Sequence, residues 1–107
     1  MTYEPVYTAR FKKNHERWQN MRDRIEEVTV QVIADPYART ERLTEKGKLN
    51  LRGCRSVHVG YHFRIIFAIC EECRQEPKCE YCFCAGLPDN AILFLTVGPH
   101  DRAYVMR

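Results

Sequence analysis

The apolar positions follow two spacings in the first third of the chain, one typical of a strand and one typical of helices. Large and polar side chains alternate in "YEPVYTAR", residues 3–10, which predicts a first strand. From about Arg10 to Ala34 apolar residues recur at helical spacing and predict one buried stripe, made of Phe11, Trp18, Met21, Ile25, Val28 and Val32. The polar run "NHERWQN" allows two helices here, a helical hairpin. Pro36 ends the region because proline disfavours a helical conformation at Asp35.

The rest of the chain predicts a polar loop and then three strands. Residues 37–50, "YARTERLTEKGKLN", predict a loop with a turn at Gly47. The segments "RSVHVG" and "HFRIIFAI" predict strands joined near Gly60 and Tyr61, and "AILFLTVG" predicts a buried strand after the turn signal "GLPDN". This order predicts an α+β fold, with helices packed on one face of a mostly antiparallel sheet. We interpret residues 1–107 as a single domain, with residues 70–88 as a Cys-rich insertion between the last two strands.

Composition and charge narrow the class of protein. A hydrophobic share of 45% and a charged share of 29% are those of an ordinary globular protein. The longest apolar runs, "IIFAIC" and "AILFL", are too short to cross a bilayer, and the N-terminus lacks the apolar region of a secretory signal. We therefore expect a cytoplasmic protein that does not bind membranes. A net charge of +3 suits a polyanionic partner without requiring one.

Five of the six cysteines lie in the stretch "CEECRQEPKCEYCFC". Two C-x-x-C pairs, separated by five residues, favour a structural zinc ion held by four thiolates, because each pair can direct two sulfur atoms the same way. The expected ligands are Cys70, Cys73, Cys79 and Cys82, with Cys84 as a substitute for Cys82. Reduced thiols in a loop and redox-active cysteines are the alternatives. Cys54, outside the stretch, is expected to be a small buried residue.

Histidine, arginine and tyrosine residues in the second half are candidates for RNA chemistry. If the last three strands are neighbours, one concave face can collect these side chains: Arg55 or His58, Arg64, His100 and Tyr104. Metal-independent RNA cleavage needs a base for the 2′-hydroxyl, an acid for the 5′-oxygen, and cations for the charged transition state. A histidine on a strand is also often structural, so the residues by themselves leave the function open.

Several segments in order resemble the RelE/ParE superfamily of bacterial and archaeal toxins, some of which are ribosome-dependent RNA endonucleases. The segments are "LRG", "RSVHV", "FRIIF" and "TVG", followed by His100 and Tyr104, and the helical region with its "ADP" stop fits the helical hairpin of the family. The resemblance covers the chain apart from residues 70–88. It implies the toxin of a type II toxin-antitoxin system, which cleaves mRNA on the ribosome without a catalytic cofactor and binds a cognate antitoxin.

The resemblance also implies roles for individual residues. Arg64 would stabilise the phosphate in the transition state, His100 would be the general acid or base, and Tyr104 would contact the target nucleotide. His58 could serve as the second proton-transfer group. Further RNA contacts are expected from the basic residues Arg55, Arg52 and Arg102.

Two other functions fit parts of the sequence. A ParE-like protein would keep the fold but inhibit DNA gyrase by binding, without nuclease activity. A zinc-stapled nucleic-acid-binding module would need a basic cysteine stretch, but Arg74 and Lys78 there are outnumbered by four glutamates.

Overall fold

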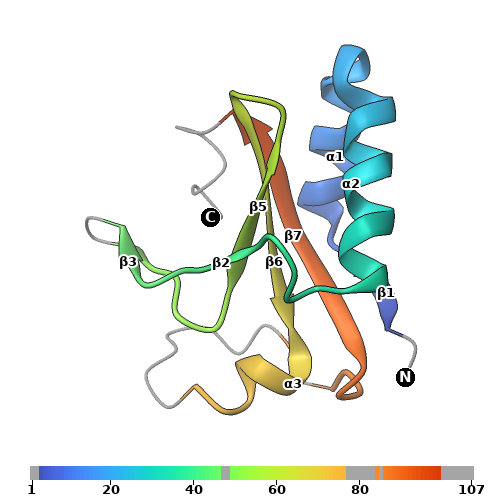
Figure 1. Cartoon of the computed structure of the whole chain (residues 1–107). Helices are drawn as coiled ribbons and strands as arrows, with labels where there is room; N and C mark the ends of the chain where they lie inside the picture. The colour runs from blue at the N-terminus through green and yellow to red at the C-terminus, as the bar shows by residue number, and fades with distance from the viewer. Residues whose placement is uncertain (1–2, 47–48, 77–83, 85, 100–107) are drawn as a thin grey trace.

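The computed structural model describes residues 3–46, 49–76, 84 and 86–99. Two antiparallel helices lie side by side against one face of a five-stranded sheet (Figure 1). The elements of the N-terminal half are β1 (Glu4–Tyr7), α1 (Ala9–Arg17), the 3₁₀ turn Gln19–Met21, α2 (Arg22–Ala34), β2 (Glu41–Arg42) and β3 (Glu45–Lys46). The C-terminal half holds β4 (Leu49–Asn50), β5 (Arg55–Val59), β6 (Phe63–Ile69), α3 (Cys70–Cys73) and β7 (Ala91–Pro99).

The main sheet has the strand order β1-β7-β6-β5-β2. All of its pairs are antiparallel except β1 with β7, so the predicted α+β class and mostly antiparallel sheet are confirmed. The β5–β6 turn spans residues 60–62, and Gly60 has a φ of +67°, which a residue with a side chain adopts at a cost. The tight connection expected near Gly60 is therefore present.

The helical hairpin forms as its sequence predicts. The hydroxyl of Thr8 accepts a hydrogen bond from the backbone N–H of Phe11 and so caps the start of α1. The break between the helices falls in the polar run, at Trp18 and the following 3₁₀ turn. Asp35 is extended, as a residue before proline should be, and α2 ends at Ala34.

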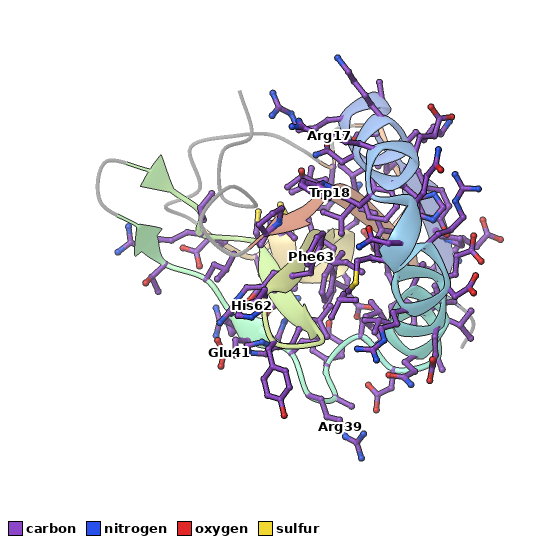
Figure 2. The ribbon with its side chains drawn as sticks, turned by 90° about the horizontal axis from the view of Figure 1, so that it is seen from above. Arg17, Trp18, Arg39, Glu41, His62 and Phe63 are labelled. Atoms are coloured by element: carbon purple, nitrogen blue, oxygen red, sulfur yellow. The ribbon has the colours of Figure 1, made fainter. Side chains whose placement is uncertain are left out.

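One core lies between the helices and the sheet. Phe11, Ile25 and Val32 of the predicted stripe are buried in it, and Trp18, Met21 and Val28 pack at its margin. The strands supply the other side with alternate residues, except where a register shift between β6 and β7 separates the last two: Val57, Val59, Ile65, Phe67, Ile69, Ile92, Phe94 and Val97. Trp18 meets Phe63 edge to face at a centroid distance of 5.1 Å, between the helices and the strands (Figure 2). This core fixes which face of each strand points away from the helices.

A second core covers part of the other face of the sheet. It contains Ile66, Ala68, Leu93 and Leu95 from the strands, together with Leu43, Leu51, Cys54, Cys70, Cys73 and Cys84. The expectation of a plain loop over residues 37–50 is therefore wrong. The segment pairs with β5 through β2, forms a small β3–β4 ladder, and buries Leu43 beneath it. The turn expected at Gly47 lies outside the described residues, and the burial expected for Cys54 is confirmed.

No helix in the described part of the chain is long and apolar enough to cross a membrane.

Candidate functional site

The candidate site is a polar cluster on the face of the sheet that points away from α1 and α2. Arg64 on β6 lies directly across from His58 on β5, and Ser56 shares their face. Glu41, from β2 at the sheet edge, completes the group. We call these residues, Glu41, Ser56, His58 and Arg64, the Arg64 cluster. The register of β5 and β6 follows from the apolar residues that alternate with these polar ones, since Val57 and Ile65 must face the helices.

Arg64 is largely shielded but weakly paired. Its side chain is 15% exposed, and one guanidinium nitrogen lies 3.5 Å from the Ser56 hydroxyl, at the limit of a hydrogen bond. The same nitrogen lies 3.8 Å from a carboxylate oxygen of Glu41, whose side chain is 68% exposed. An ion pair with so exposed a carboxylate contributes about 0–1 kcal/mol. An incoming phosphate can therefore replace Glu41 as the partner of Arg64.

The histidines differ in position. His58 is exposed on β5 and lies beside Arg64, as expected. His62 opens the segment "HFRIIFAI" that was predicted to be a strand, but β6 begins at Phe63 and His62 lies in the exposed turn. Figure 2 shows His62 and Glu41 on the strand side of the molecule, away from the helices.

The three C-terminal candidates, His100, Arg102 and Tyr104, lie outside the described residues. The described chain ends at Pro99, which pairs with Phe63, and Gly98 pairs with Arg64. Arg52 lies in the partly exposed turn before β5.

Arg55 is not part of the Arg64 cluster. It pairs with Phe67, a residue of the helix-side core, whereas His58 pairs with Arg64 on the other face. Residues three apart on a strand point to opposite faces, so Arg55 and His58 cannot share one. This corrects the expectation that either residue could join Arg64 on the same concave face.

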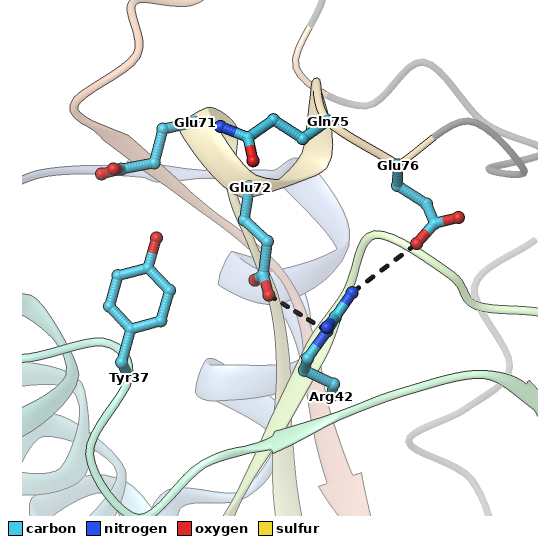
Figure 3. Close-up of a pocket in the computed structure, with 6 residues that line it drawn as sticks. All are labelled: Tyr37, Arg42, Glu71, Glu72, Gln75 and Glu76. Carbon is cyan, nitrogen blue, oxygen red and sulfur yellow. Dashed lines mark ion pairs between the residues drawn. The ribbon is translucent and has the colours of Figure 1, made fainter.

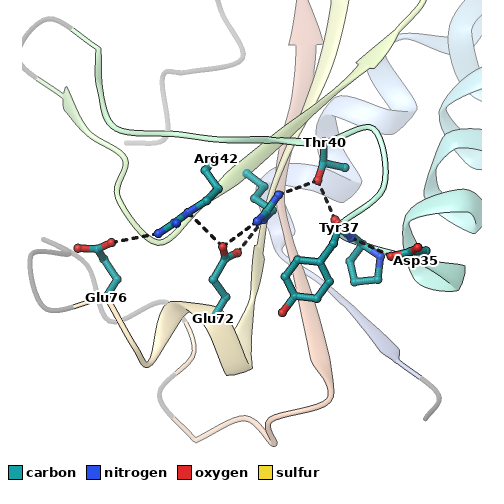
Figure 4. Close-up of polar contacts among 8 residues, drawn as sticks. Asp35, Tyr37, Thr40, Arg42, Glu72 and Glu76 are labelled. Atoms are coloured by element: carbon teal, nitrogen blue, oxygen red, sulfur yellow. Dashed lines mark hydrogen bonds and ion pairs between the residues drawn. The ribbon is translucent and has the colours of Figure 1, made fainter.

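Arg55 instead connects the sheet to α3 through a polar network, in which Figure 4 labels Thr40, Arg42 and Glu72. Two nitrogens of its guanidinium lie 2.8 and 2.9 Å from the two carboxylate oxygens of Glu72, a bidentate pair between side chains 11% and 16% exposed. A third nitrogen donates to Thr40 at 3.1 Å, and the group lies 4.9 Å from the ring centre of Tyr37. Arg42 adds ion pairs of 3.3 Å to Glu72 and 3.7 Å to Glu76.

Beside this network lies a cavity of about 310 Å³ (Figure 3). It is lined by Tyr37, Arg42, Glu71, Glu72, Gln75 and Glu76. Two tyrosines at this end of the sheet have raised pKa values. A hydrogen bond to Glu71 raises the pKa of Tyr3. Burial is the larger cause of the raised pKa of Tyr37, and the negative charge of Glu71 adds to it. Arg42 of the cavity pairs with Arg55, whereas its neighbour Glu41 pairs with Ser56, so the cavity and the Arg64 cluster lie on opposite faces of the sheet. The glutamates of the cavity were visible in the cysteine stretch, but nothing in the sequence placed Tyr37 and Arg42 beside them.

A second cavity, of about 440 Å³, lies on the helical hairpin, where Phe11 and Ile25 line it together with Tyr7, His15 and Val30. This cavity lies at the helices, so it is separate from the Arg64 cluster, which lies on the opposite face of the sheet.

Three cysteines of the predicted metal site are described, and all three are buried: Cys70, Cys73 and Cys84. They are free thiols, and Cys84 hydrogen-bonds with both of the others. Burial raises the pKa of Cys84 and of Cys70, while Cys84 and the positive charge of Arg74 act in the opposite direction on Cys70. Cys79 and Cys82 lie outside the described residues.

Comparison with known proteins finds similarity to solved structures alone. No protein-family model matches the sequence, and no curated sequence matches it. Among solved structures, the chain is similar to the toxin-antitoxin complex RelBE2 from Mycobacterium tuberculosis, with a TM-score of 0.66 at 14% identity over 94% of this chain and 100% of that one. It is also similar to YafQ from E. coli, with a TM-score of 0.64 at 14% identity over 95% of this chain and 98% of that chain.

Two further similarities agree with these. The E. coli DinJ-YafQ toxin-antitoxin complex aligns with a TM-score of 0.63 at 14% identity over 97% of this chain and 99% of that one. The YoeB/ParE toxin from Agrobacterium tumefaciens gives a TM-score of 0.63 at 14% identity, over 91% and 98% of the two chains. The resemblance read from the sequence is therefore confirmed at the level of the fold: this chain shares the fold of the RelBE2, YoeB/ParE and YafQ structures.

Proposed function

We propose that the protein is the toxin of a type II toxin-antitoxin system, an endoribonuclease that cleaves mRNA on the ribosome in the cytoplasm. The observation that carries the proposal is the Arg64 cluster, on a sheet with the fold of RelE, YoeB and YafQ toxins. It offers a shielded guanidinium with a weak partner next to an exposed imidazole. These two groups supply charge stabilisation and proton transfer, which RNA cleavage requires.

The proposed reaction needs no metal ion or cofactor. A base removes the proton of the 2′-hydroxyl, the 2′-oxygen attacks phosphorus, and the bond from phosphorus to the 5′-oxygen breaks as an acid protonates that oxygen. The products are a 2′,3′-cyclic phosphate and a free 5′-hydroxyl. His58 and His100 are the proposed proton-transfer pair, and imidazole suits either role near neutral pH.

Arg64 is the proposed stabiliser of the pentavalent phosphorane. Its side chain is 15% exposed and faces the same side of the sheet as Ser56 and His58, where a guanidinium can stabilise the developing charge. Tyr104 is proposed to contact the target nucleotide, and Arg52 and Arg102 to bind the RNA backbone. Arg55 is left out of this set because two of its guanidinium nitrogens already donate to Glu72 and the third donates to Thr40.

The test is cleavage of mRNA on programmed ribosomes by purified wild-type protein and two variants, Arg64→Ala and His100→Ala. We expect cuts by the wild type, and a loss of about 10²- to 10³-fold in rate without Arg64, the size of effect seen when a transition-state donor is removed. Arg22→Ala, which removes the same charge from the exposed side of α2, is the matched control and should cleave normally.

Two results would contradict this proposal. Equal cleavage by Arg64→Ala and the wild type would remove Arg64 from the site. No cleavage by folded wild type would favour the ParE-like alternative, which a DNA gyrase supercoiling assay then tests directly.

We also propose that a cognate antitoxin binds and neutralises the protein. RelBE2 and DinJ-YafQ were both solved as toxin-antitoxin complexes, and a net charge of +3 suits an acidic partner segment. Co-expression with the product of the adjacent reading frame should restore growth and yield a complex on purification. Unrelieved growth arrest, with no complex, would reject that product as the antitoxin.

A further inference from the structure

The turn between β5 and β6 exposes an aromatic ring. Tyr61, in this turn, is 97% exposed, more than any other large hydrophobic side chain that the structure describes. The pair that precedes the turn is Val59 with Phe63, and the Arg64 cluster begins at the next pair along the ladder. A tyrosine ring open to water on both faces therefore lies at the edge of the Arg64 cluster.

The turn is held in place from the helix side. A Cβ atom at Gly60 would lie 3.4 Å from a guanidinium nitrogen of Arg24 and 3.9 Å from the terminal carbon of Met21, so the start of α2 touches the turn. Phe63, directly after the turn, packs edge to face on Trp18. Figure 1 shows the turn at the end of the molecule where α1 meets α2. A ligand that binds the turn therefore has little backbone freedom left to remove, which favours binding.

Exposed arginines lie at the same end of the molecule. Arg24 is exposed, with its guanidinium against the turn. Arg17 is also exposed, and its guanidinium carbon lies 5.2 Å from the ring centre of Trp18. Figure 2, which looks down on this end, shows Trp18 between Arg17 and Phe63. The Arg64 cluster lies on the face of the sheet opposite the helices, so positively charged groups flank the turn on both sides.

This arrangement suits a single strand of nucleic acid. An exposed aromatic ring stacks on a base, and cations beside it bind the phosphates of the backbone. We propose that the β5–β6 turn binds the RNA substrate beside the cleavage site, with Tyr61 stacked on a base and Arg24 bound to a phosphate. The inference rests on the proposed function, which makes RNA the substrate and brings the reacting phosphate to Arg64. Stacking tolerates every base, so the turn contributes affinity without selecting a sequence.

Fluorescence anisotropy with a labelled single-stranded RNA of about eight nucleotides tests the contact. Because every 2′-hydroxyl of this RNA is methylated, the proposed cleavage cannot take place during the measurement. We expect Tyr61→Ala to bind about 5- to 150-fold more weakly than the wild type, the range for the loss of one base–aromatic stack, and Tyr61→Phe to bind as the wild type does. A duplex of the same sequence should bind more weakly than the single strand, since its bases already stack on one another.

The salt dependence of binding tests the arginine. In Arg24→Ala, the plot of log affinity against log salt concentration should become shallower by about 0.7, the value for one phosphate contact on a single strand. Arg22→Ala is the matched control, because Arg22 also lies on α2, but two residues along a helix point in different directions. Its slope should equal that of the wild type.

Failure of this inference is distinguishable from failure of the proposed function. Equal binding by Tyr61→Ala and the wild type, no binding of the single strand by the wild type, or equal binding of the duplex would each overturn the contact. If the wild type binds RNA through Tyr61 but does not cleave mRNA on ribosomes, the nuclease is rejected and the contact stands. If Tyr61→Ala cleaves with the kcat/KM of an active wild type, the contact is rejected and the nuclease stands.

Discussion

Replacing Glu72 by glutamine should measure how strongly α3 is attached to the sheet. The substitution keeps the size of the side chain but removes the charge opposite Arg55, whose guanidinium is 11% exposed. Removing one partner from a fully buried pair costs about 3–5 kcal/mol. Glu72 is 16% exposed and glutamine still offers one acceptor, so we expect a loss of about 2–3 kcal/mol.

The assay is urea unfolding of Glu72→Gln and the wild type, at the same metal concentration, with the free energy of unfolding taken from the midpoint at constant slope. The melting temperature should fall by about 8–12 °C, at about 4 °C per kcal/mol for a domain of this size. Glu26→Gln removes a charge 60% exposed and 3.6 Å from His15, and should change stability by less than about 0.5 kcal/mol.

A double-mutant cycle with Arg55→Met identifies the source of the loss. If the pair is responsible, the coupling energy between the two substitutions should be about 2 kcal/mol. A loss below about 1 kcal/mol for Glu72→Gln, the value of an exposed ion pair, would refute the reasoning from burial.

Three more predictions concern the core, the turn and pH. Phe67→Ala should destabilise the protein by about 3–5 kcal/mol in urea unfolding, because its ring is fully buried against the helix-side core; a loss under about 1 kcal/mol would contradict that packing. Gly60→Ala should lower the free energy of unfolding by about 1 kcal/mol, because Gly60 has a positive φ. Gly98→Ala should not lower it in the same urea unfolding measurement, because the added Cβ would lie 3.9 Å from its nearest neighbour, a nitrogen of Trp18. The pKa of Tyr3 is raised in the folded protein, so above about pH 10 this tyrosine loses its proton more readily in the unfolded chain. The free energy of unfolding should therefore fall with rising pH in this range, and less steeply in Tyr3→Phe than in the wild type. Equal pH slopes for the two proteins would contradict the hydrogen bond between Tyr3 and Glu71.

The predictable parts of the fold are those in which local pattern and burial agree. The helical stripe from Phe11 to Val32 and the apolar strand from Phe63 to Ile69 each bury one face or both, so the sequence period was enough to identify them. The short strands around Leu43 were not predicted, because single leucines separated by polar residues show neither a helical nor a strand spacing. These two-residue strands form through pairing with distant residues.

The candidate site was partly predictable for the same reason. Arg64 and His58 were found because their strands have clear boundaries, and register then placed them opposite one another. Spacing along β5 already implied that Arg55 faces the other way, since three positions along a strand reverse the side. Its partner Glu72 could not be predicted, because the pairing depends on how α3 folds back toward β2.

The position of β7 in the sheet has a consequence for synthesis on the ribosome. β7 lies between β1 and β6, and it is translated after the other strands of the sheet that the structure describes. Until residue 94 has emerged, β1 lacks its full pairing with β7, and the aromatic ring of Phe94 is missing from the contacts it makes with Tyr7, Phe11 and Phe67. The nascent chain therefore cannot complete this sheet before β7 has left the ribosome. Folding depends on the pairing of β1 with β7, which are far apart in the sequence, and this makes it slow relative to the folding of a helical protein of the same length.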